Sequence, residues 1–546
     1  MSKQTFLRLY WLVFVSAAAV FLSGGCEQFI DDQDYYELEV APEKLRQIET
    51  LDLEAAKSKA ASPADVNEAA PPEIELTLEQ CRALAMENNL DLKVQLISPA
   101  IAAEKVSEQE ARFEAAIFSN VGFSRTDTPT STRLTGSKVD YSNVDLGVQV
   151  PLRTGGTVTF DIADSRTKTN EEFEFWILNP AYTSDLSISI SQPLLRNAGT
   201  RANTYAIRIA DYERQITDVQ TKLEIIRVIA DADRWYWRLY AARRELDVRK
   251  KQYDLAKAQL DQARRFVDAG ERPLIEVIRA EAGVAERLEA IIVAENNLRD
   301  RERELKKLLN KPGLDMQTPT VVLPATEPDP VHYELDKQTL VTQAVDNRME
   351  MLELELQIAA DVSTVDYLQN QALPLVTLDY TYNINGLGAT RDESFDLLRY
   401  KNFEDHRLGL QLLVPLGNEA ARSKLLQAFY QRRQRLATWQ NRSSIIELEV
   451  LNAVDQLEAN WQRILAGRQN AILAARLFEA EKRQFELGLG TSTDVLDAQT
   501  TFADAQSAEI SALTEYQIAL VDLAYATGTL LGAAKVQWEP IVPQSN

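Results

Sequence analysis

Residues 269–277 read AGERPLIEV and residues 487–495 read LGLGTSTDV, and each stretch interrupts a long run of helix-compatible sequence. Neither proline nor glycine occurs between Ala202 and Ala269. That segment alone predicts a helix on the order of 100 Å long, at about 1.5 Å per residue. Gly270 and Gly488 are expected to permit tight turns, because glycine tolerates positive φ. Each stretch therefore predicts the turn of a long antiparallel helical hairpin.

Apolar residues recur every seven positions before and after the first turn and before the second turn. In the first series, alanines lie three residues after several of these apolar positions. This spacing is typical of helices that pack as coiled coils, and the small alanines favour close approach. The series are Leu239, Leu246, Tyr253, Leu260 and Val267 before the first turn, Val277, Val284, Ile291, Leu298 and Leu305 after it, and Leu457, Ile464, Ala471, Phe478 and Phe485 before the second turn.

The chain also repeats itself on a larger scale. MENNLDL at 86–92 matches VDNRMEM at 345–351, an offset of 346 − 87 = 259 residues. Gln192-Pro193-Leu194 matches Val414-Pro415-Leu416 at an offset of 222, and the two tip turns lie 218 residues apart. We therefore predict a tandem duplication whose first copy carries an insertion of about 37 residues between positions 126 and 183.

Segments that alternate apolar and polar side chains predict strands with one apolar face. A sheet of this kind is the pattern of a transmembrane barrel, and a soluble sandwich is the alternative. The expected strands lie at about 116–126 and 183–193 in the first copy and at about 375–386 and 406–415 in the second, and the insertion adds an extra hairpin at about 143–163.

The N-terminus carries an export signal. Lys3 and Arg8 precede a short apolar run, and the sequence then reads LSGGC, which ends at Cys26. LSGGC resembles a bacterial lipobox, which implies removal of residues 1–25 and acylation of Cys26. An ordinary signal peptide that happens to include a cysteine is the alternative. No later stretch has the roughly 18 consecutive apolar residues that a spanning helix requires.

These observations give a predicted organisation for the whole chain. The fold class is mainly α with membrane β, in two repeats that each combine two strands with a long antiparallel coiled-coil hairpin. The predicted segments are a signal peptide at 1–25, an acidic lipid-anchored linker at 26–72, a first repeat at 73–311 with its helical hairpin at about 200–310, a Pro-rich linker at 312–331, a second repeat at 332–532 with its helical hairpin at about 419–531, and a tail at 533–546.

Composition argues against several classes of function. The net charge of −23 disfavours nucleic acid, because phosphate binding needs clustered Lys and Arg. The only cysteines are Cys26 and Cys81, and the only histidines are His332 and His406, so neither a metal site nor a cofactor site is expected. Cys81 lies on an amphipathic segment and is expected to be a buried small hydrophobe. The sequence therefore predicts a protein that is not an enzyme.

Three segments resemble the TolC-type outer-membrane efflux proteins. GLGTSTDVLDA at 488–498 is similar to the family's periplasmic tip turn, SQPLLR at 191–196 to its strand-to-helix junction, and Leu78 to Leu92 to its first helix. The resemblance implies a homotrimer whose protomers each lend four strands to a twelve-stranded barrel in outer-membrane lipid, with a helical tunnel into the periplasm. It also implies a periplasmic adaptor and an inner-membrane transporter as partners, and a passive outer-membrane channel of efflux or type I secretion as function.

Two other classes remain as alternatives. A periplasmic adaptor lipoprotein also carries a coiled-coil hairpin, and a lipid-anchored coiled-coil scaffold of the envelope fits the helices alone. Adaptors usually carry one hairpin, whereas this chain is expected to have two. The extra hairpin at 143–163 departs from the family's simplest pattern. It either joins the barrel or forms an external loop, and we expect the insertion to lie as a loop on the cell-surface side.

The resemblance also assigns candidate site residues at the tip. Asp494 and Asp497 match aspartates that form an acidic entrance ring in the family, and Glu276 is the first-copy counterpart of Asp494. Such a ring favours cations in the pore. Helix capping is the alternative role for these carboxylates. The family's tyrosine and arginine latch is expected to be weak here, because Phe485 and Gly490 occupy those places.

Overall fold

A computed structural model describes residues 72–129, 137–170 and 178–536. By its contacts the chain divides into Met1–Ala70 and Pro71–Asn546, and everything described belongs to the second unit. The predicted signal peptide, Cys26, nearly all of the acidic linker and the end of the C-terminal tail lie outside the described residues.

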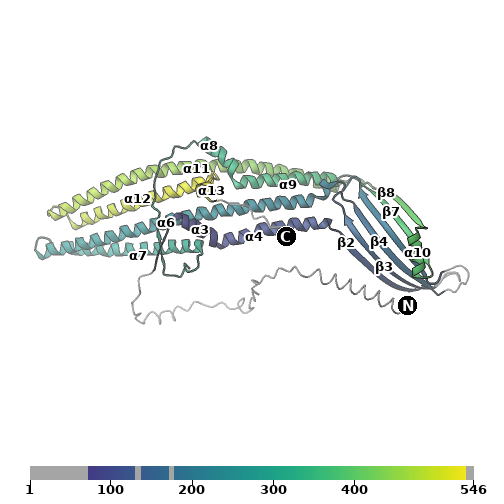
Figure 1. Cartoon of the computed structure of the whole chain (residues 1–546). Helices are drawn as coiled ribbons and strands as arrows, with labels where there is room; N and C mark the ends of the chain where they lie inside the picture. The colour runs from purple at the N-terminus through teal and green to yellow at the C-terminus, as the bar shows by residue number, and fades with distance from the viewer. Residues whose placement is uncertain (1–71, 130–136, 171–177, 537–546) are drawn as a thin grey trace, which may run out of the picture. The chain divides into compact units, whose positions relative to one another are not determined.

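Four long helices form two antiparallel hairpins (Figure 1). α6 (Tyr205–Asp268) returns as α7 (Ile275–Leu309), and α11 (Glu419–Glu486) returns as α12 (Ser492–Ala526). The heptad positions make the seams because they place one apolar stripe on each helix. The buried heptad residues include Leu239, Leu246, Leu260, Leu298, Leu305, Leu457, Ile464, Ala471 and Phe485.

Each hairpin is preceded in the chain by a pair of shorter helices. α3 (Leu78–Asn88) is followed by α4 (Leu90–Glu110), and α8 (Lys337–Asn347) is followed by α9 (Met349–Gln371). The first pair breaks at Asn89, whose side chain accepts a hydrogen bond from the Leu92 amide and so caps α4. α4 packs on α6, and α9 packs on both α6 and α11. The structure is therefore mostly helical.

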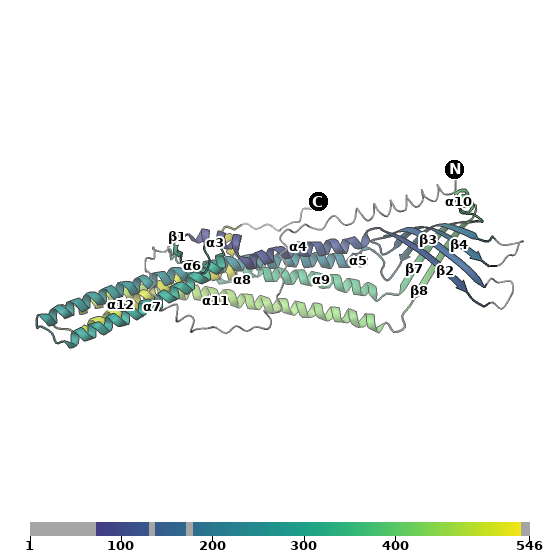
Figure 2. The same ribbon diagram turned by 90° about the horizontal axis from the view of Figure 1, so that it is seen from below.

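Six of the strands form one antiparallel sheet, which lies at the far end of the helices from the tip turns (Figure 2). Its spatial order is β2-β3-β4-β5-β7-β8. The strand bounds are β2 Ala116–Asp127, β3 Lys138–Pro151, β4 Thr157–Thr169, β5 Ala181–Pro193, β7 Leu375–Gly388 and β8 Glu404–Leu413.

The extra hairpin does not form the surface loop that was expected. Its strands, β3 and β4, lie inside the sheet between β2 and β5 and are paired along most of their length on both sides. The prediction of an external loop is therefore wrong, and each chain contributes six strands to its sheet, not the four that the resemblance implied. The reason is visible in the sequence, since β3 and β4 have the same apolar alternation as their neighbours.

Several short elements lie where only connections were expected. β1 (Glu73–Leu76) pairs in parallel with β6 (Val321–Pro324). Of the two strands, β6 lies inside the predicted inter-repeat linker. α10 (Arg391–Tyr400) connects β7 to β8. Short helical turns at Ala111–Phe113, Thr200–Asn203 and Leu530–Ala533 complete the described chain. Within the described residues, none of the helices is both long and apolar enough to cross a membrane.

Candidate functional site

The six-stranded sheet has two chemically different faces. Side chains alternate between the two faces along each strand, and cross-strand partners lie on the same face. The pairing register therefore brings the apolar side chains of all six strands together on one face. Many of these side chains are exposed, and such a continuous exposed apolar patch marks a surface that contacts lipid or another protein. The exposed apolar residues of this face are Ile117, Val121, Phe123, Leu146, Phe160, Ile162, Leu186, Ile190, Tyr380, Leu408, Leu410 and Leu412.

The opposite face is polar and carries mostly oxygen-bearing side chains. Its ladder includes Ser187, whose hydroxyl donates to Asp161 at 2.6 Å, and Asn385, whose amide donates to Asp405 at 3.0 Å. Ser191 likewise donates to Asp379 on the neighbouring strand, at 2.6 Å. The carboxylates of this face are Asp145, Asp161, Asp185, Asp379 and Asp405. This face can therefore line an aqueous lumen that prefers cations.

α10 covers the loop end of the apolar face. The hydroxyl of its Ser394 donates to Ser184 at 2.9 Å, and Arg391 pairs with Asp164 at 2.8 Å. Gly386 is required beneath the helix, because a Cβ built there would lie 2.1 Å from the Ser394 carbonyl oxygen. Ser184, Asp164 and Gly386 all belong to the apolar side of the sheet. α10 therefore marks the end of the apolar band, and nothing in the alternation pattern predicted it.

The two helical hairpins end in similar turns. Gly270 has a φ of 75° and Gly488 a φ of 82°, the left-handed conformation that favours glycine at the end of a helix. In each turn the third residue after the helix donates its amide back into the last helical turn, Glu271 to Phe266 and Leu489 to Gln484, both at 2.9 Å. Both glycines therefore lie where the sequence predicted the hairpins to reverse.

Two side chains of the first hairpin contact the second hairpin at this tip. Glu276, only 4% exposed, accepts a hydrogen bond from the Ser492 amide at 2.8 Å. Arg272 donates to the Phe485 carbonyl at 3.3 Å, and its guanidinium lies over the Phe485 ring, 5.2 Å from the centroid. The two tips are thus joined within one chain. The sequence interpretation did not find these contacts, because they join residues more than 200 positions apart.

The tip carboxylates occupy different environments. Asp494 is exposed and forms a capping box with Thr491, whose amide and hydroxyl donate to it at 2.9 and 2.7 Å. The Thr491 hydrogen bonds lower the pKa of Asp494 below its ordinary value. Asp497 is exposed one turn further along α12 and lines a cavity between α7 and α12. Glu276, in contrast, is buried between the hairpins, so Asp494 and Asp497 are the two candidates with exposed carboxylates.

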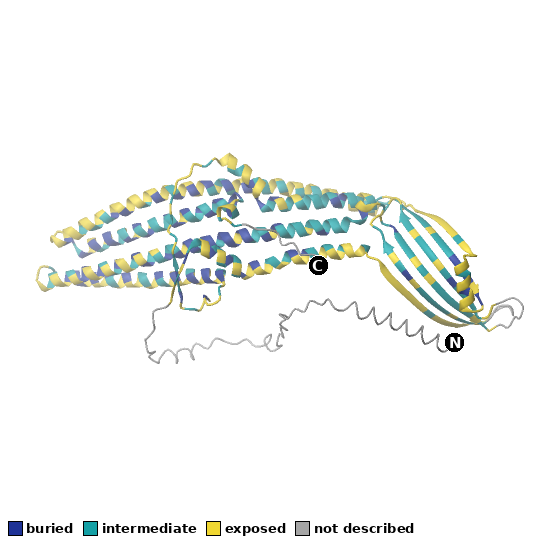
Figure 3. Cartoon of the chain, in the orientation of Figure 1, coloured by how far each residue is buried: buried dark blue, intermediate teal, exposed yellow. Residues whose placement is uncertain are grey.

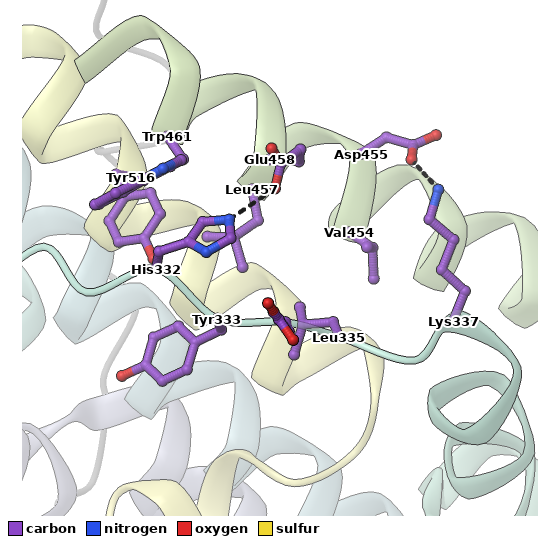
Figure 4. A pocket seen from close by; sticks show the side chains of 11 residues that line it. His332, Tyr333, Leu335, Lys337, Val454, Asp455, Leu457, Glu458, Trp461 and Tyr516 are labelled. Carbon is purple, nitrogen blue, oxygen red and sulfur yellow. Dashed lines mark hydrogen bonds and ion pairs between the residues drawn. The ribbon is translucent and has the colours of Figure 1, made fainter. Parts of the chain in front are cut away.

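A second cavity, of about 350 Å³, lies where the segment between the repeats crosses α11 and α12 (Figure 4). His332 approaches Glu458 at 3.4 Å, and Lys337 pairs with Asp455 at 2.5 Å. Tyr516 donates to the Val331 carbonyl. These contacts fasten the connecting segment to the helices. Among the described residues, no three His, Cys, Asp or Glu side chains gather as a metal site.

A buried ion pair lies in the main helical core. Arg82 of α3 donates to both carboxylate oxygens of Asp233 on α6, at 2.7 and 2.8 Å. The Asp233 side chain is fully buried, and this burial raises its pKa although Arg82 acts in the opposite direction. Cys81 beside it is also fully buried, with a pKa raised to about 12 mainly by desolvation. The prediction that Cys81 is a buried small hydrophobe is confirmed.

Together, the long helical hairpins and the two-faced sheet define a channel-forming envelope protein. Residues 340–529 match the model of the family described as outer membrane efflux protein. The outer membrane protein TolC of Vibrio cholerae serotype O1 is 24% identical over 355 residues, which cover 63% of this chain and 76% of that protein.

Solved structures show the same fold. The outer-membrane channel OprN superposes with a TM-score of 0.62 at 15% identity, over 83% of this chain and 90% of that one. The Campylobacter jejuni CmeC outer membrane channel gives a TM-score of 0.61, also at 15% identity, over 83% and 86%. Over residues 340–529 the chain thus matches the outer membrane efflux protein family, and its fold is that of the TolC-like outer-membrane channels.

Proposed function

We propose that this chain is one protomer of a passive exit duct of the outer membrane. Three copies close a barrel with their sheets and a tunnel with their helical hairpins, and cargo passes through both. A periplasmic adaptor and an energised inner-membrane transporter deliver that cargo to the helical tip. The chain itself supplies the path and performs no chemistry on the cargo.

The observation that carries this proposal is the pairing of opposite faces on one sheet. The apolar face suits contact with hydrocarbon, and the Ser, Thr, Asn and Asp side chains of the other face suit a water-filled lumen. Inside a membrane every strand edge must be paired, so the sheets of several copies must close on one another. Two further proposals belong to it. Acylated Cys26 anchors the mature N-terminus in lipid, and Asp494 with Asp497 forms an acidic ring at the tip.

A matched pair of substitutions on β5 tests the assignment of the two faces. Ile188 belongs to the apolar face and Ser189, the next residue, to the polar face. Ile188→Arg should cost about 2–4 kcal/mol if its face meets the middle of the bilayer, whereas Ser189→Arg places the same charge in water. The yield of heat-modifiable oligomers in detergent measures this difference. Equal losses for the two variants would refute the assignment.

Conductance in planar bilayers tests the duct itself. The purified protein is expected to give discrete current steps, and Ser189→Arg is expected to keep them with a reduced preference for cations. A protein that binds membranes and forms oligomers without any current step would instead be an adaptor or a scaffold.

A further inference from the structure

The described sheet ends in two unpaired edge strands, β2 and β8. Almost every residue of both strands is exposed, whereas the four strands between them are mostly half-buried (Figure 3). The outer edge of each strand leaves its N–H and C=O groups without ladder partners. Unpaired backbone groups of this kind cannot face hydrocarbon, because each would cost several kcal/mol. Both edges therefore need a strand from another chain.

The apolar band shows how the sheet would sit in a bilayer. Phe123 on β2 is the direct cross-strand partner of Ser142 on β3. Leu408 on β8 is connected to Val150 on β3 through successive cross-strand partners on β7, β5 and β4. Phe123 and Leu408 are the last outward apolar residues of their strands toward the loop end. The limit of the band thus shifts by eight residues between Ser142 and Val150, across five strand-to-strand steps.

This shift is a measure of strand tilt. At about 3.3 Å per residue and 4.8 Å between strands, it corresponds to a tilt of roughly 45° relative to the band. Strands in membrane barrels tilt by about 35–45°. The apolar band runs diagonally over all six strands, which indicates that all six cross the same hydrocarbon layer of the membrane. β3 and β4 carry it through Leu146, Val148, Phe160 and Ile162, so they belong to the wall of the barrel.

We propose that β2 of one copy pairs antiparallel with β8 of the next, so that three copies close an eighteen-stranded barrel. The inference rests on the trimeric duct proposed above. An even number of strands per chain keeps every junction antiparallel, and the apolar faces stay on one side. Because barrel diameter grows roughly in proportion to strand number, this bore is about one and a half times as wide as a twelve-stranded one.

The wider bore has a consequence for cargo. Barrels of 16–18 strands enclose an aqueous channel, and the lumen here is lined by hydroxyl, amide and carboxylate groups. Such a barrel admits hydrated and bulky polar cargo, polypeptides included, without close contact. Selection by size then falls to the helical tip, where α7 and α12 converge on Asp497.

Direct imaging tests the strand number on the unmodified protein. Cryo-electron microscopy of the full chain in lipid nanodiscs should show a closed ring of eighteen strands in a three-copy particle. Three copies with a twelve-stranded ring, and β3 and β4 outside it, would overturn the inference and leave the duct intact. Particles without three copies by native mass spectrometry would contradict the proposed trimer itself.

Cysteine cross-linking tests the junction. Val121→Cys on β2 is combined in turn with Leu408→Cys, Leu410→Cys or Leu412→Cys on β8, which lie at similar depth in the band. At least one pair should give covalent dimers and trimers on oxidation. The matched control is Val144→Cys on β3 with the same β8 partners, which should give none because β2 shields it. Cross-linking only within single chains would mean that each sheet closes on itself, which contradicts the proposal.

Discussion

The carboxylate of Glu276 accepts the backbone amide of Ser492 across the two hairpins, 2.8 Å away in a buried contact. It does for α12 what an N-cap side chain does, from a helix in the other repeat. Arg279 pairs with the same carboxylate at 2.9 Å. The tip of each chain is therefore held together by the first repeat capping the second.

Removal of this contact should loosen the tip. Glu276→Ala leaves the Ser492 amide without its partner, which costs about 1–3 kcal/mol for a buried group. We expect faster hydrogen exchange at the Ser492 amide and a higher closed-state conductance. Glu276→Gln should have a smaller effect, because its carbonyl oxygen still accepts. Glu281→Ala is the control, since Glu281 is exposed and pairs with Arg264 on the neighbouring helix of the same hairpin. Unchanged exchange in Glu276→Ala would refute the clamp.

The two exposed tip aspartates can be separated by single substitutions. Asp497→Asn should reduce cation preference and block by multivalent cations without lowering thermal stability, because it removes charge alone. Asp494→Asn should reduce both, since Asp494 also caps α12. The lowered pKa of Asp494 means that its stabilising effect is present above its ordinary value of 3.8 and is lost as the pH falls below it. If neither variant changes selectivity, the acidic ring lies elsewhere.

The buried pair of Arg82 and Asp233 should be a strong determinant of stability. Arg82→Gln leaves a buried carboxylate without its cation, a change that costs about 3–5 kcal/mol. Arg227→Gln is the control, because Arg227 is exposed and its pair with Glu224 should contribute at most about 1 kcal/mol. Denaturant unfolding of the two variants measures the difference. Equal losses would mean that the Arg82 pair contributes little.

The same variant should show a defined pH dependence. The pKa of Asp233 is raised in the folded state, so protonation of this group favours folding, and its contribution to stability falls as the pH rises through that pKa. Loss of Arg82 removes a charge that lowers this pKa. The deficit of Arg82→Gln relative to the native chain should therefore grow from acid toward neutral pH, and a deficit that shrinks would contradict this account.

Deletion of the inserted hairpin should change the wall of the barrel. Replacement of residues 140–165 by a short Gly/Ser loop removes most of β3 and β4 and leaves β2 without its present partner. We expect loss of heat-modifiable trimers, measured on a semi-native gel. As a control, a Gly/Ser replacement confined to 130–136, between β2 and β3, should leave assembly intact. Normal trimers after the 140–165 replacement would show that the hairpin is dispensable.

Acylation of Cys26 has a direct readout. Mass spectrometry of the mature N-terminus should find residues 1–25 removed and acyl chains on Cys26. Cys26→Ser should remove that mass while barrel assembly persists, because an acyl chain anchors but does not span. Unmodified Cys26 in the native protein, or cleavage at another position, would contradict the lipoprotein assignment.

Features that depend on a local pattern of residues were predictable from the sequence. Seven-residue spacing predicted the hairpin seams, and Leu239, Leu457 and Leu305 are buried there. Helix-stopping glycines predicted the turns at Gly270 and Gly488, which adopt the required positive φ. Alternation predicted strands and their two faces. These features could be read locally because periodicity and backbone preference act over a few residues.

Features that depend on partners distant in the chain could be seen only in the folded protein. Alternation in β3 and β4 says that they are strands, but only pairing with β2 and β5 shows that they lie inside the sheet. Likewise, Glu276 and Asp494 occupy matching positions in the two repeats, yet one is buried and the other exposed. The difference arises because α7 and α12 meet different neighbours at the tip. Residue type fixes which interactions are possible, and the packing of distant segments selects among them.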